Sequence, residues 1–296
     1  MASNNCNIEE YIKETADLVE TALSECFECS DADISSVYDA MKYSTLGGGK
    51  RIRAFLVLEF CKMFGGNEAA AKKFACALEM IHAFSLIHDD LPCMDDDDMR
   101  RGKPSCHIRF GEAEALIAGD ALIMLAYETA ASADCDPQTA LEAVKLLSSR
   151  AGARGMCGGQ AMDMYAEKNS ITYDYLIKLQ SLKTGALIET AAQLGCLSAG
   201  VKAEKVNDAV KYASCIGRAF QIIDDILDVE GDEQTLGKRI GSDSESEKTT
   251  FVTSLGIEGA RAEAKRLTEE AAECIRKYEN AENLTSLAEW LYERKH

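Results

Sequence analysis

The sequence predicts an all-α protein in which residues 1–296 form one large helical bundle with a central cavity. Apolar residues recur at helical spacing through nearly the whole chain, and they make up 47% of it, enough for a large core. Only 3 of the 296 residues are proline, the residue that most strongly interrupts a helix. No linker-like segment divides the chain, which favours a single bundle over two domains.

Glycine, proline and polar runs mark where the expected helices begin and end. The longest polar run, residues 231–248, carries both charge signs and three glycines. The simplest interpretation is a solvated loop, although loops of this length in compact domains are often lids over a functional site. The other breaks fall at residues 47–49, 65–66, 102–104 and 136–137. The expected helices cover residues 7–29, 51–64, 67–90, 112–131, 138–152, 172–198, 203–230, 257–279 and 283–294.

The composition excludes several classes of protein. The chain has 50 acidic and 32 basic residues, a formal net charge of −18, which argues against nucleic acid as a partner. No apolar stretch approaches the ~18 residues that a membrane span needs, since the best candidate, residues 115–127, is interrupted by Asp120. The first residues lack the basic segment and apolar core of a signal peptide.

The 12 cysteines are spread singly along segments with helical spacing. Cys26 and Cys29 form the one close pair, and no second pair or histidine completes a zinc site around them. A chain of this size does not need disulfides to be stable. We therefore expect reduced cysteines that act as small core side chains, in a cytoplasmic protein.

Two acidic segments carry the strongest functional signal. We call residues 89–98 the first acidic box and residues 224–228 the second. Each begins where an apolar stripe, at steps of three and four residues, demands a core residue. Burying a carboxylate there without a cation would cost several kcal/mol. The stripes are Phe74, Leu78, Ile81 and Ser85 before the first box, and Val206, Val210, Ala213, Gly217 and Phe220 before the second.

A single acidic run of this kind would more simply be an exposed helix end with solvated charge. Two runs that each end an apolar stripe favour a metal site instead. Asp224 and Asp228 are four residues apart and share a helix face. Pro92 interrupts the earlier helix, which allows Asp95 to return to the face of Asp89. Oxygen ligands without EF-hand spacing favour Mg²⁺ over Ca²⁺, with a phosphorylated ligand completing the shell.

Basic residues are scarce, so their clusters are informative. Lys50, Arg51 and Arg53 follow three glycines, but the segment lacks the Gly-Lys-Ser/Thr of a nucleotide P-loop. Arg100 and Arg101 directly follow the first acidic box. Arginine binds phosphate oxygens through a planar pair of N–H groups, and lysine binds them as a point charge. Because these cations are separate from the acids that would bind a metal, we expect two phosphate positions. Further candidates are Lys183, Lys238, Arg239 and His82. Without the other cations, His82 would more often be interpreted as an ordinary core histidine.

Together these motifs resemble the trans-isoprenyl diphosphate synthases of the short-chain type, most of all the bacterial farnesyl diphosphate synthases. The resemblance implies the isoprenoid synthase type of bundle and head-to-tail elongation of allylic diphosphates by isopentenyl diphosphate. It also implies a homodimer and Mg²⁺ as cofactor, with about three ions in the closed complex. The motifs are Gly-Gly-Lys-Arg-Ile-Arg, the first box with Arg-Arg-Gly, Lys183-Thr184-Gly185, Phe220-Gln221, and the second box with Gly237-Lys238.

The resemblance assigns a role to each matched residue. The residues that would hold Mg²⁺ against the allylic diphosphate are Asp89, Asp95 and Asp224, supported by Asp90, Asp225 and Asp228. Those that would grip the same diphosphate are Arg100, Lys183 and Lys238. Those that would bind isopentenyl diphosphate are Lys50, Arg53, His82 and Arg101, with Phe220 at the border. Thr184 and Gln221 would face the allylic cation. The expected catalytic residues are thus Asp89, Lys183, Thr184, Gln221 and Asp224.

Product length is predicted from Phe84 and Ser85. Phe84 lies five residues before Asp89, ~7.5 Å along the helix, where a ring would floor the tunnel and stop growth near C15. The two extra residues in the first box, Pro92 and Cys93, also resemble the bacterial farnesyl type. The alternative is that Phe84 is an ordinary core residue.

Other functions stay open at this point. The same chemistry could stop at C10 or C20, giving a geranyl or geranylgeranyl diphosphate synthase. A third possibility is a non-catalytic partner subunit or an acidic ion-binding protein. A silent subunit would be expected to lack carboxylates or arginines of one box, and both boxes are intact. A terpene cyclase would not need the cations at residues 50–53. Ala54 replaces the usual proline, and the segment 247–251 departs from the family pattern, which leaves Lys248 without an assigned role.

Overall fold

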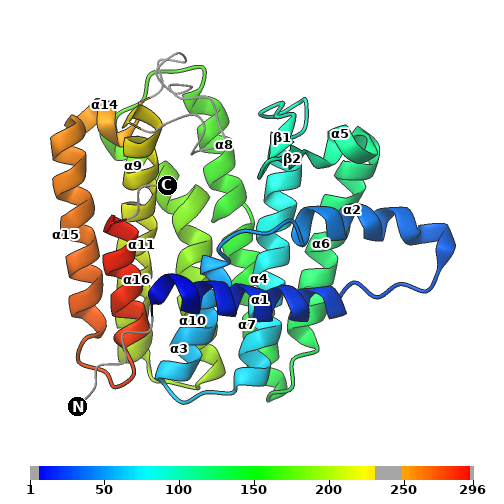
Figure 1. Ribbon diagram of the computed structural model, residues 1–296, viewed down its shortest axis with the longest axis horizontal. Coiled ribbons are helices and arrows are strands. Elements are labelled where there is room, and N and C mark those ends of the chain that lie inside the picture. Colours follow the sequence, from blue (N-terminus) through cyan, green and yellow to red (C-terminus); the bar gives the residue numbers. More distant parts are fainter. Residues whose placement is uncertain (1–6, 231–248, 294–296) are drawn as a thin grey trace.

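The computed structural model describes residues 7–230 and 249–293, which form helices and one short hairpin (Figure 1). The first elements are α1 (Ile8–Glu25), η1 (Ala32–Ile34), α2 (Ser35–Thr45), α3 (Ile52–Met63), α4 (Glu68–Asp89), β1 (Met99–Arg100) and β2 (Lys103–Pro104). The middle elements are α5 (Cys106–Phe110), α6 (Glu112–Ala131), α7 (Pro137–Ala151), α8 (Met156–Ala166), α9 (Tyr173–Gln180), η2 (Ser181–Gly185) and α10 (Ala186–Ser198). The last are α11 (Ala203–Glu230), α14 (Phe251–Leu255), α15 (Ile257–Ile275) and α16 (Glu282–Glu293).

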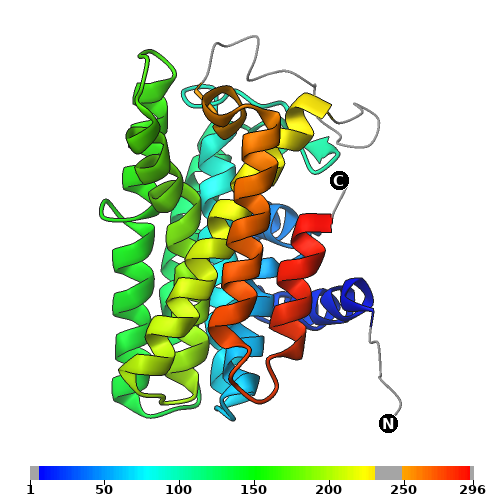
Figure 2. The same ribbon diagram turned by 90° about the vertical axis from the view of Figure 1, so that its left-hand side faces the viewer.

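Most of the long helices run along one direction, and α1 crosses them (Figure 1, Figure 2). Helix α4 packs against both α3 and α6, and α10 lies against α3 and α11. On the other side α15 covers α11, and α16 packs on α15 and α3. The predicted all-α bundle is therefore confirmed. No helix in the described ranges is long and apolar enough to cross a membrane.

Helices α3, α4 and α10 form the centre of the core because they are apolar on nearly every side. Phe55, Phe60 and Phe74 are fully buried in it. Helix α10 approaches α3 so closely that a Cβ at Gly195 would lie 2.5 Å from the carbonyl oxygen of Val57. Glycine is therefore required at this crossing.

The sequence predicts the long helices well and the short elements poorly. The segments 112–131 and 203–230 are found as α6 and α11 with the expected bounds. The helices expected at 7–29 and 257–279 are too long, because α1 ends at Glu25 and α15 at Ile275. The segment 172–198 is helical throughout but contains a π-helical turn, η2. The run 231–248, with its expected lid, lies outside the described residues. The elements that the helical period missed are α2, β1, β2, α5, α8 and α14.

The buried side of α11 differs from the expected stripe. Asp224 and Asp228, together with Val206, Val210 and Phe220, are only partly buried. The aspartates therefore lie at the edge of the core, where they border solvent-accessible space, rather than inside it. The fully buried positions of this helix include Ala209, Tyr212, Ala213, Ile216, Ala219, Ile222 and Ile226.

All cysteines in the described part of the chain are free thiols, in agreement with the expected reduced state. The expectation that they are core side chains is wrong for Cys93 and Cys157, which are exposed. Cys93 lies in the turn after α4. Burial raises the pKa of the Cys157 thiol, and the charge of Asp89 raises it further, which shows that Cys157 lies near the first acidic box. Buried cysteines are Cys61, Cys76, Cys106, Cys196 and Cys215.

Candidate active site

The first acidic box folds back on the end of α4. Asp89 is the last residue of this helix, and the turn after Pro92 brings the chain back so that the Asp95 backbone N–H donates to the Asp89 carbonyl oxygen at 2.9 Å. Burial raises the pKa of Asp89 to about 6, against the lowering effect of Lys183, and the Asp95 carboxylate raises it further. Two aspartates of this box and Lys183 therefore share one electrostatic environment.

Asp90, the next residue along the chain, holds Arg100. Its carboxylate, 3% exposed, accepts hydrogen bonds from the Arg100 guanidinium, with one Nε–Oδ1 distance of 2.9 Å. Arg100 also reaches Asp97 at 3.1 Å. Arg100 is thus oriented beside the first box by its own acids, and Asp90 supports the box through Arg100.

The second acidic box lies at the end of α11, beside a hydrogen-bonded pair. The Thr184 hydroxyl donates to the Gln221 side-chain oxygen at 2.7 Å. One turn further along α11, the Asp225 carboxylate accepts the backbone N–H of Phe251 at 2.8 Å, which fixes the start of α14. Gln221 and Asp225 line a cavity of about 160 Å³ together with Asp163 of α8.

Lys183 connects the first box to Asp163 of α8. Lys183 lies in η2, and its ammonium forms an ion pair with Asp163. Burial raises the pKa values of Asp89 and Asp95, and the charge of Lys183 opposes this effect. Helix α8 approaches η2 closely, because a Cβ at Gly159 would lie 2.2 Å from the Lys183 backbone nitrogen. Asp163 thereby links the lysine beside the first box to the cavity beside the second.

Sequence reasoning missed Asp163, although a usable signal was present. Met156 and Gly159 are buried, and Asp163 continues their steps of three and four along α8, as the acidic boxes do after their own stripes. Gln160, on the same helix, has a buried side-chain amide with no hydrogen-bond partner among the described residues. The two glycines of α8 concealed this helix, because glycine disfavours helix formation in sequence-based reasoning.

The ends of α4 and α11 lie at the same end of the bundle (Figure 1, Figure 2). The two boxes are therefore walls of one region and are not splayed to opposite sides. In the described ranges no three Asp, Glu, His or Cys side chains converge closely enough to hold a metal ion by themselves. A bridging ligand with its own oxygens fits this spacing.

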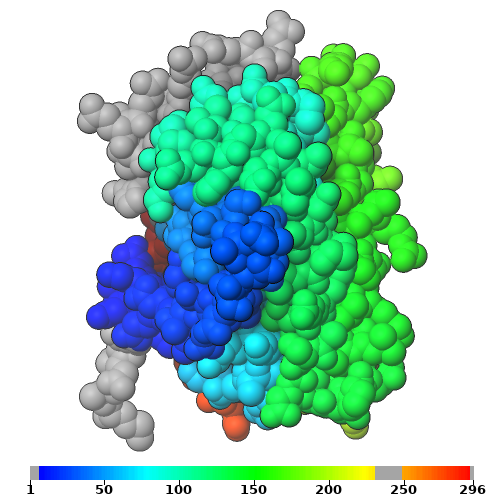
Figure 3. Space-filling view, turned by 90° about the vertical axis from the view of Figure 1, so that its right-hand side faces the viewer, coloured from blue at the N-terminus to red at the C-terminus, as the bar shows by residue number. Residues whose placement is uncertain are grey.

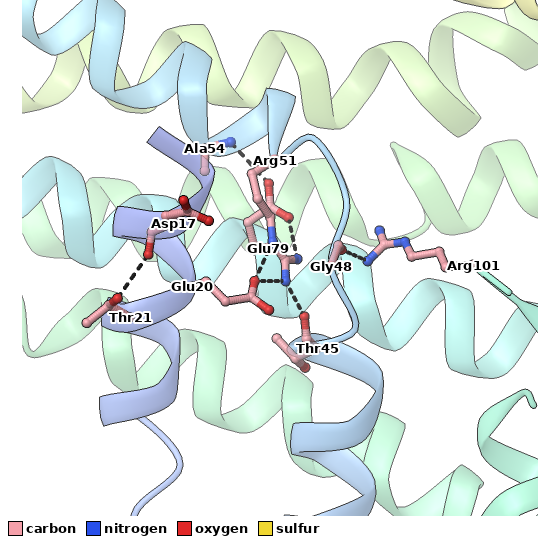
Figure 4. A network of polar contacts seen from close by, with 9 residues as sticks. All are labelled: Asp17, Glu20, Thr21, Thr45, Gly48, Arg51, Ala54, Glu79 and Arg101. Carbon is pink, nitrogen blue, oxygen red and sulfur yellow. Dashed lines mark hydrogen bonds and ion pairs between the residues drawn. The ribbon is translucent and has the colours of Figure 1, made fainter. Parts of the chain in front are cut away.

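Arg51, one of the clustered cations, is a structural residue rather than a ligand-binding one. Its guanidinium is buried against Glu20 at 2.5 Å and Glu79 at 3.2 Å, and it also donates to the Thr45 carbonyl oxygen (Figure 4). Arg51 has a φ of 49°, a left-handed conformation that is costly for a residue with a Cβ. This network fixes the turn from which the neighbouring cations project.

Arg53, His82 and Arg101 form a group with an excess of positive charge. Burial lowers the pKa of His82 well below its ordinary value, and the charges of Arg53 and Arg101 lower it further. Burial also lowers the pKa of Arg53, whose Nε has no partner among the described residues, and that of Arg101, which donates to the Gly48 carbonyl oxygen (Figure 4). Such a group is suited to an anion with several oxygens.

The remaining predicted site residues are placed as follows. Lys50 is exposed at the start of this turn, and Phe220 is partly buried on α11 one position before Gln221. Phe84 is 6% exposed on α4, with its ring 5.8 Å from that of His88, and Ser85 donates to the His82 carbonyl oxygen. Lys238 and Lys248 lie outside the described residues.

An all-α bundle with two acidic boxes at one end, a lysine beside the first box and a group of buried cations is the architecture of a helical enzyme that handles diphosphate esters. A family model described as polyprenyl synthetase matches residues 34–291. The chain belongs to this family, and it is a trans-prenyltransferase of isoprenoid biosynthesis.

Relatives with known products cover most of the chain. It is 45% identical to farnesyl diphosphate synthase from Escherichia coli (strain K12), over 87% of this chain and 89% of the relative. It is 40% identical to geranylgeranyl diphosphate synthase from Cyanophora paradoxa, over 98% and 97%. A geranyltransferase from Helicobacter pylori, solved with magnesium and isoprenyl diphosphate, has a TM-score of 0.86 at 30% identity, covering 99% of this chain and 100% of that one.

Proposed function

We propose that the chain condenses isopentenyl diphosphate head-to-tail with dimethylallyl diphosphate and then geranyl diphosphate, giving farnesyl diphosphate. The observation that carries this proposal is that the two acidic boxes lie at one end of the bundle, with Lys183 beside the first of them. A chain elongation needs two diphosphate positions, and the group around Arg53 and His82 supplies the second. The E. coli relative carries the same product in its name.

Mg²⁺ fits the donor set of the first position. Asp89 and Asp95 on one wall would hold it, and so would Asp224, Asp225 and Asp228 on the other, all through carboxylate oxygens. Burial raises the pKa values of Asp89 and Asp95, so their charged forms gain from a cation. About three ions would complete the closed complex, and when bound they neutralise charge that develops on the leaving diphosphate.

The side chains of this protein would then divide the remaining steps. Lys183 and Arg100 bind the allylic diphosphate, whose C–O bond breaks with the electron pair going to the diphosphate oxygen. Thr184 and Gln221, held together by their hydrogen bond, direct dipoles at the allylic cation. The isopentenyl double bond attacks this cation to form the new C–C bond, and a proton passes to the departed diphosphate.

The second diphosphate position explains why the enzyme would add a C5 unit rather than cyclise its substrate. Arg53, His82 and Arg101 would hold isopentenyl diphosphate, with Lys50 at the entrance and Phe220 at the border. His82 stays neutral because its pKa is lowered, so it acts as a hydrogen-bonding group while the arginines carry the charge.

Phe84 and Ser85 favour a C15 product. The Phe84 ring is buried five residues before Asp89 and packs edge-on against His88, so a large side chain stands on α4 close to the first box. The full-length similarity to the Cyanophora relative makes geranylgeranyl diphosphate the second candidate. Both acidic boxes are intact, which does not favour a silent subunit.

A homodimer would cover the outer face of α6. Leu116, Ile117 and Met124 on this helix are large apolar residues that are each about half exposed. Leu116 and Ile117 are adjacent, and Met124 follows them after about two helical turns, so the three side chains lie on one face. The surface over α6 is open on the side shown in Figure 3. A second copy would bury this apolar face.

The decisive experiment incubates purified protein with isopentenyl and dimethylallyl diphosphates, with Mg²⁺ or with a chelator. We expect diphosphate release and a C15 alcohol after phosphatase treatment with Mg²⁺, and neither with the chelator. A C20 product would support the second candidate. Failure to form any elongated product with Mg²⁺ would contradict the proposed function.

A further inference from the structure

The C-terminal helix α16 brings an aromatic ring to a cation of the site. The Nζ of Lys50 lies 4.9 Å from the centroid of the Trp290 ring. On its other side the Trp290 indole donates through Nε1 to Glu9 of α1 at 2.8 Å. Trp290 is the only tryptophan in the chain.

The position of this ring is fixed by the surrounding elements. Leu287 and Leu291, on either side of Trp290 along α16, are buried in the core. Glu59 of α3 ties the neighbouring helices together, because it accepts from Asn283 of α16 at 2.8 Å and from Tyr11 of α1 at 2.6 Å. The indole is therefore held between α16 and α1, two helices that Glu59 of α3 ties together.

Lys50 itself directly follows two glycines. Gly48 and Gly49 have φ values of 88° and 114°, and the Lys50 side chain is exposed. A long lysine side chain loses considerable rotamer freedom when it is fixed for binding. The indole face limits that freedom in advance through its cation–π contact with the ammonium.

We propose that Trp290 is a positioning residue for isopentenyl diphosphate, holding the Lys50 ammonium at the entrance of the second diphosphate position. The C-terminal helix thereby becomes part of that substrate site. The inference rests on the proposed function, because it takes Lys50 to bind isopentenyl diphosphate.

Steady-state kinetics with Trp290→Leu test the inference. We expect the KM for isopentenyl diphosphate to rise roughly 2- to 5-fold, the range of an exposed cation–π contact, with kcat and the KM for geranyl diphosphate nearly unchanged. Trp290→Phe, which keeps an aromatic face, should recover part of the affinity. Tyr292→Leu, an exposed position on the same helix, is the matched control and should leave both KM values unchanged.

A double-mutant comparison separates this role from a structural one. If Trp290 acts through Lys50, Trp290→Leu should add little to the effect of Lys50→Met on the KM for isopentenyl diphosphate. Additive effects, or equal losses for both substrates, would overturn the inference. Should Lys50→Met itself leave that KM unchanged, the proposed role of Lys50 would fail. An effect of Lys50→Met without one of Trp290→Leu would refute only the role of Trp290.

The single tryptophan supplies a readout that is independent of turnover. Isopentenyl diphosphate added alone should change the Trp290 emission of the wild-type protein as Lys50 shifts from the ring to the ligand. Lys50→Met should alter the emission of the free protein and abolish the ligand-induced change. An identical response in both proteins would contradict the contact between ring and ammonium as a part of binding.

Discussion

Arg51 and Arg53 are two positions apart and have different functions. The Arg51 guanidinium is enclosed by Glu20 and Glu79, while the Arg53 Nε has no partner in the described part of the chain. The sequence shows both as members of one basic cluster. The difference between the two arginines depends on the left-handed conformation at Arg51 and on acidic residues of α1 and α4, which are distant in the sequence.

These two arginines give a paired prediction. Arg51→Leu should lower the free energy of unfolding by about 3–5 kcal/mol, because it leaves the buried Glu79 carboxylate without its cation. Arg53→Leu should change stability little and instead raise the KM for isopentenyl diphosphate. Denaturant unfolding and steady-state kinetics measure the two effects. Equal stability of both variants would show that the Arg51 network is not structural.

Phe84 is tested against a second phenylalanine of the same helix. Phe84→Ala and Phe74→Ala each remove a buried ring from α4 and should cost about 3–5 kcal/mol of stability. Only Phe84→Ala opens space near Asp89, so only this variant should shift the product from C15 towards C20. Chromatography of the dephosphorylated products decides the matter. A C15 product from both variants would make Phe84 an ordinary core residue.

Cys26 provides a pH-dependent prediction outside the site. A hydrogen bond with Cys76 lowers the pKa of the Cys26 thiol, whereas burial raises that of Cys61 to about 11. Because the thiolate is the reactive form, the rate of Cys26 alkylation by iodoacetamide should rise to half its maximum below pH 9, the ordinary pKa of a thiol. Peptide mapping by mass spectrometry should show Cys61 unmodified there. A Cys26 midpoint near pH 9 would contradict the lowered pKa.

At the scale of elements, periodicity predicts a helix wherever a long segment has one buried face. It misses α8, where two glycines contradict helix propensity and close packing on η2 compensates. It also misses the π-helical turn Ser181–Gly185, since both neighbouring helices share one continuous apolar pattern. This turn places Lys183 and Thr184, and π-turns commonly occur at functional sites. Sequence motifs therefore identify Lys183 and Thr184 as candidate site residues, but the positions of their side chains depend on tertiary contacts that the motifs do not show.

The contact between α8 and η2 can be tested with a single methyl group. Gly159→Ala places a Cβ 2.2 Å from the Lys183 backbone nitrogen, so η2 must move. A displacement of this kind should lower kcat by about 100-fold while the protein stays helical. Gly185→Ala is the control, since its nearest neighbour would be 3.6 Å away. Similar activity of the two variants would show that the position of η2 is not critical.

At the scale of the whole molecule, the site exists because two helices distant in sequence end at the same place. Helices α4 and α11 both reach the end of the bundle that also carries the hairpin, α8 and α14 (Figure 1). Motifs in the sequence indicate which residues belong together, but they do not show that Lys183 lies beside both the first box and Asp163 of α8. The same three-dimensional arrangement leaves the outer face of α6 uncovered and far from α14, which provides a test of assembly.

Charge on the α6 face should separate the proposed homodimer. Ile117→Lys combined with Met124→Lys places two cations where a second copy would bury apolar side chains, and uncompensated burial of charge is costly. Sedimentation should then give a mass near 32.2 kDa, against about twice that value for the wild type. Leu255→Lys, an exposed apolar position on α14, should leave the mass unchanged. A wild-type protein that sediments as a monomer, or an undisturbed dimer in the double variant, would show that α6 does not form the interface. Because both acidic boxes belong to a single chain, the separated subunits should still bind the allylic diphosphate.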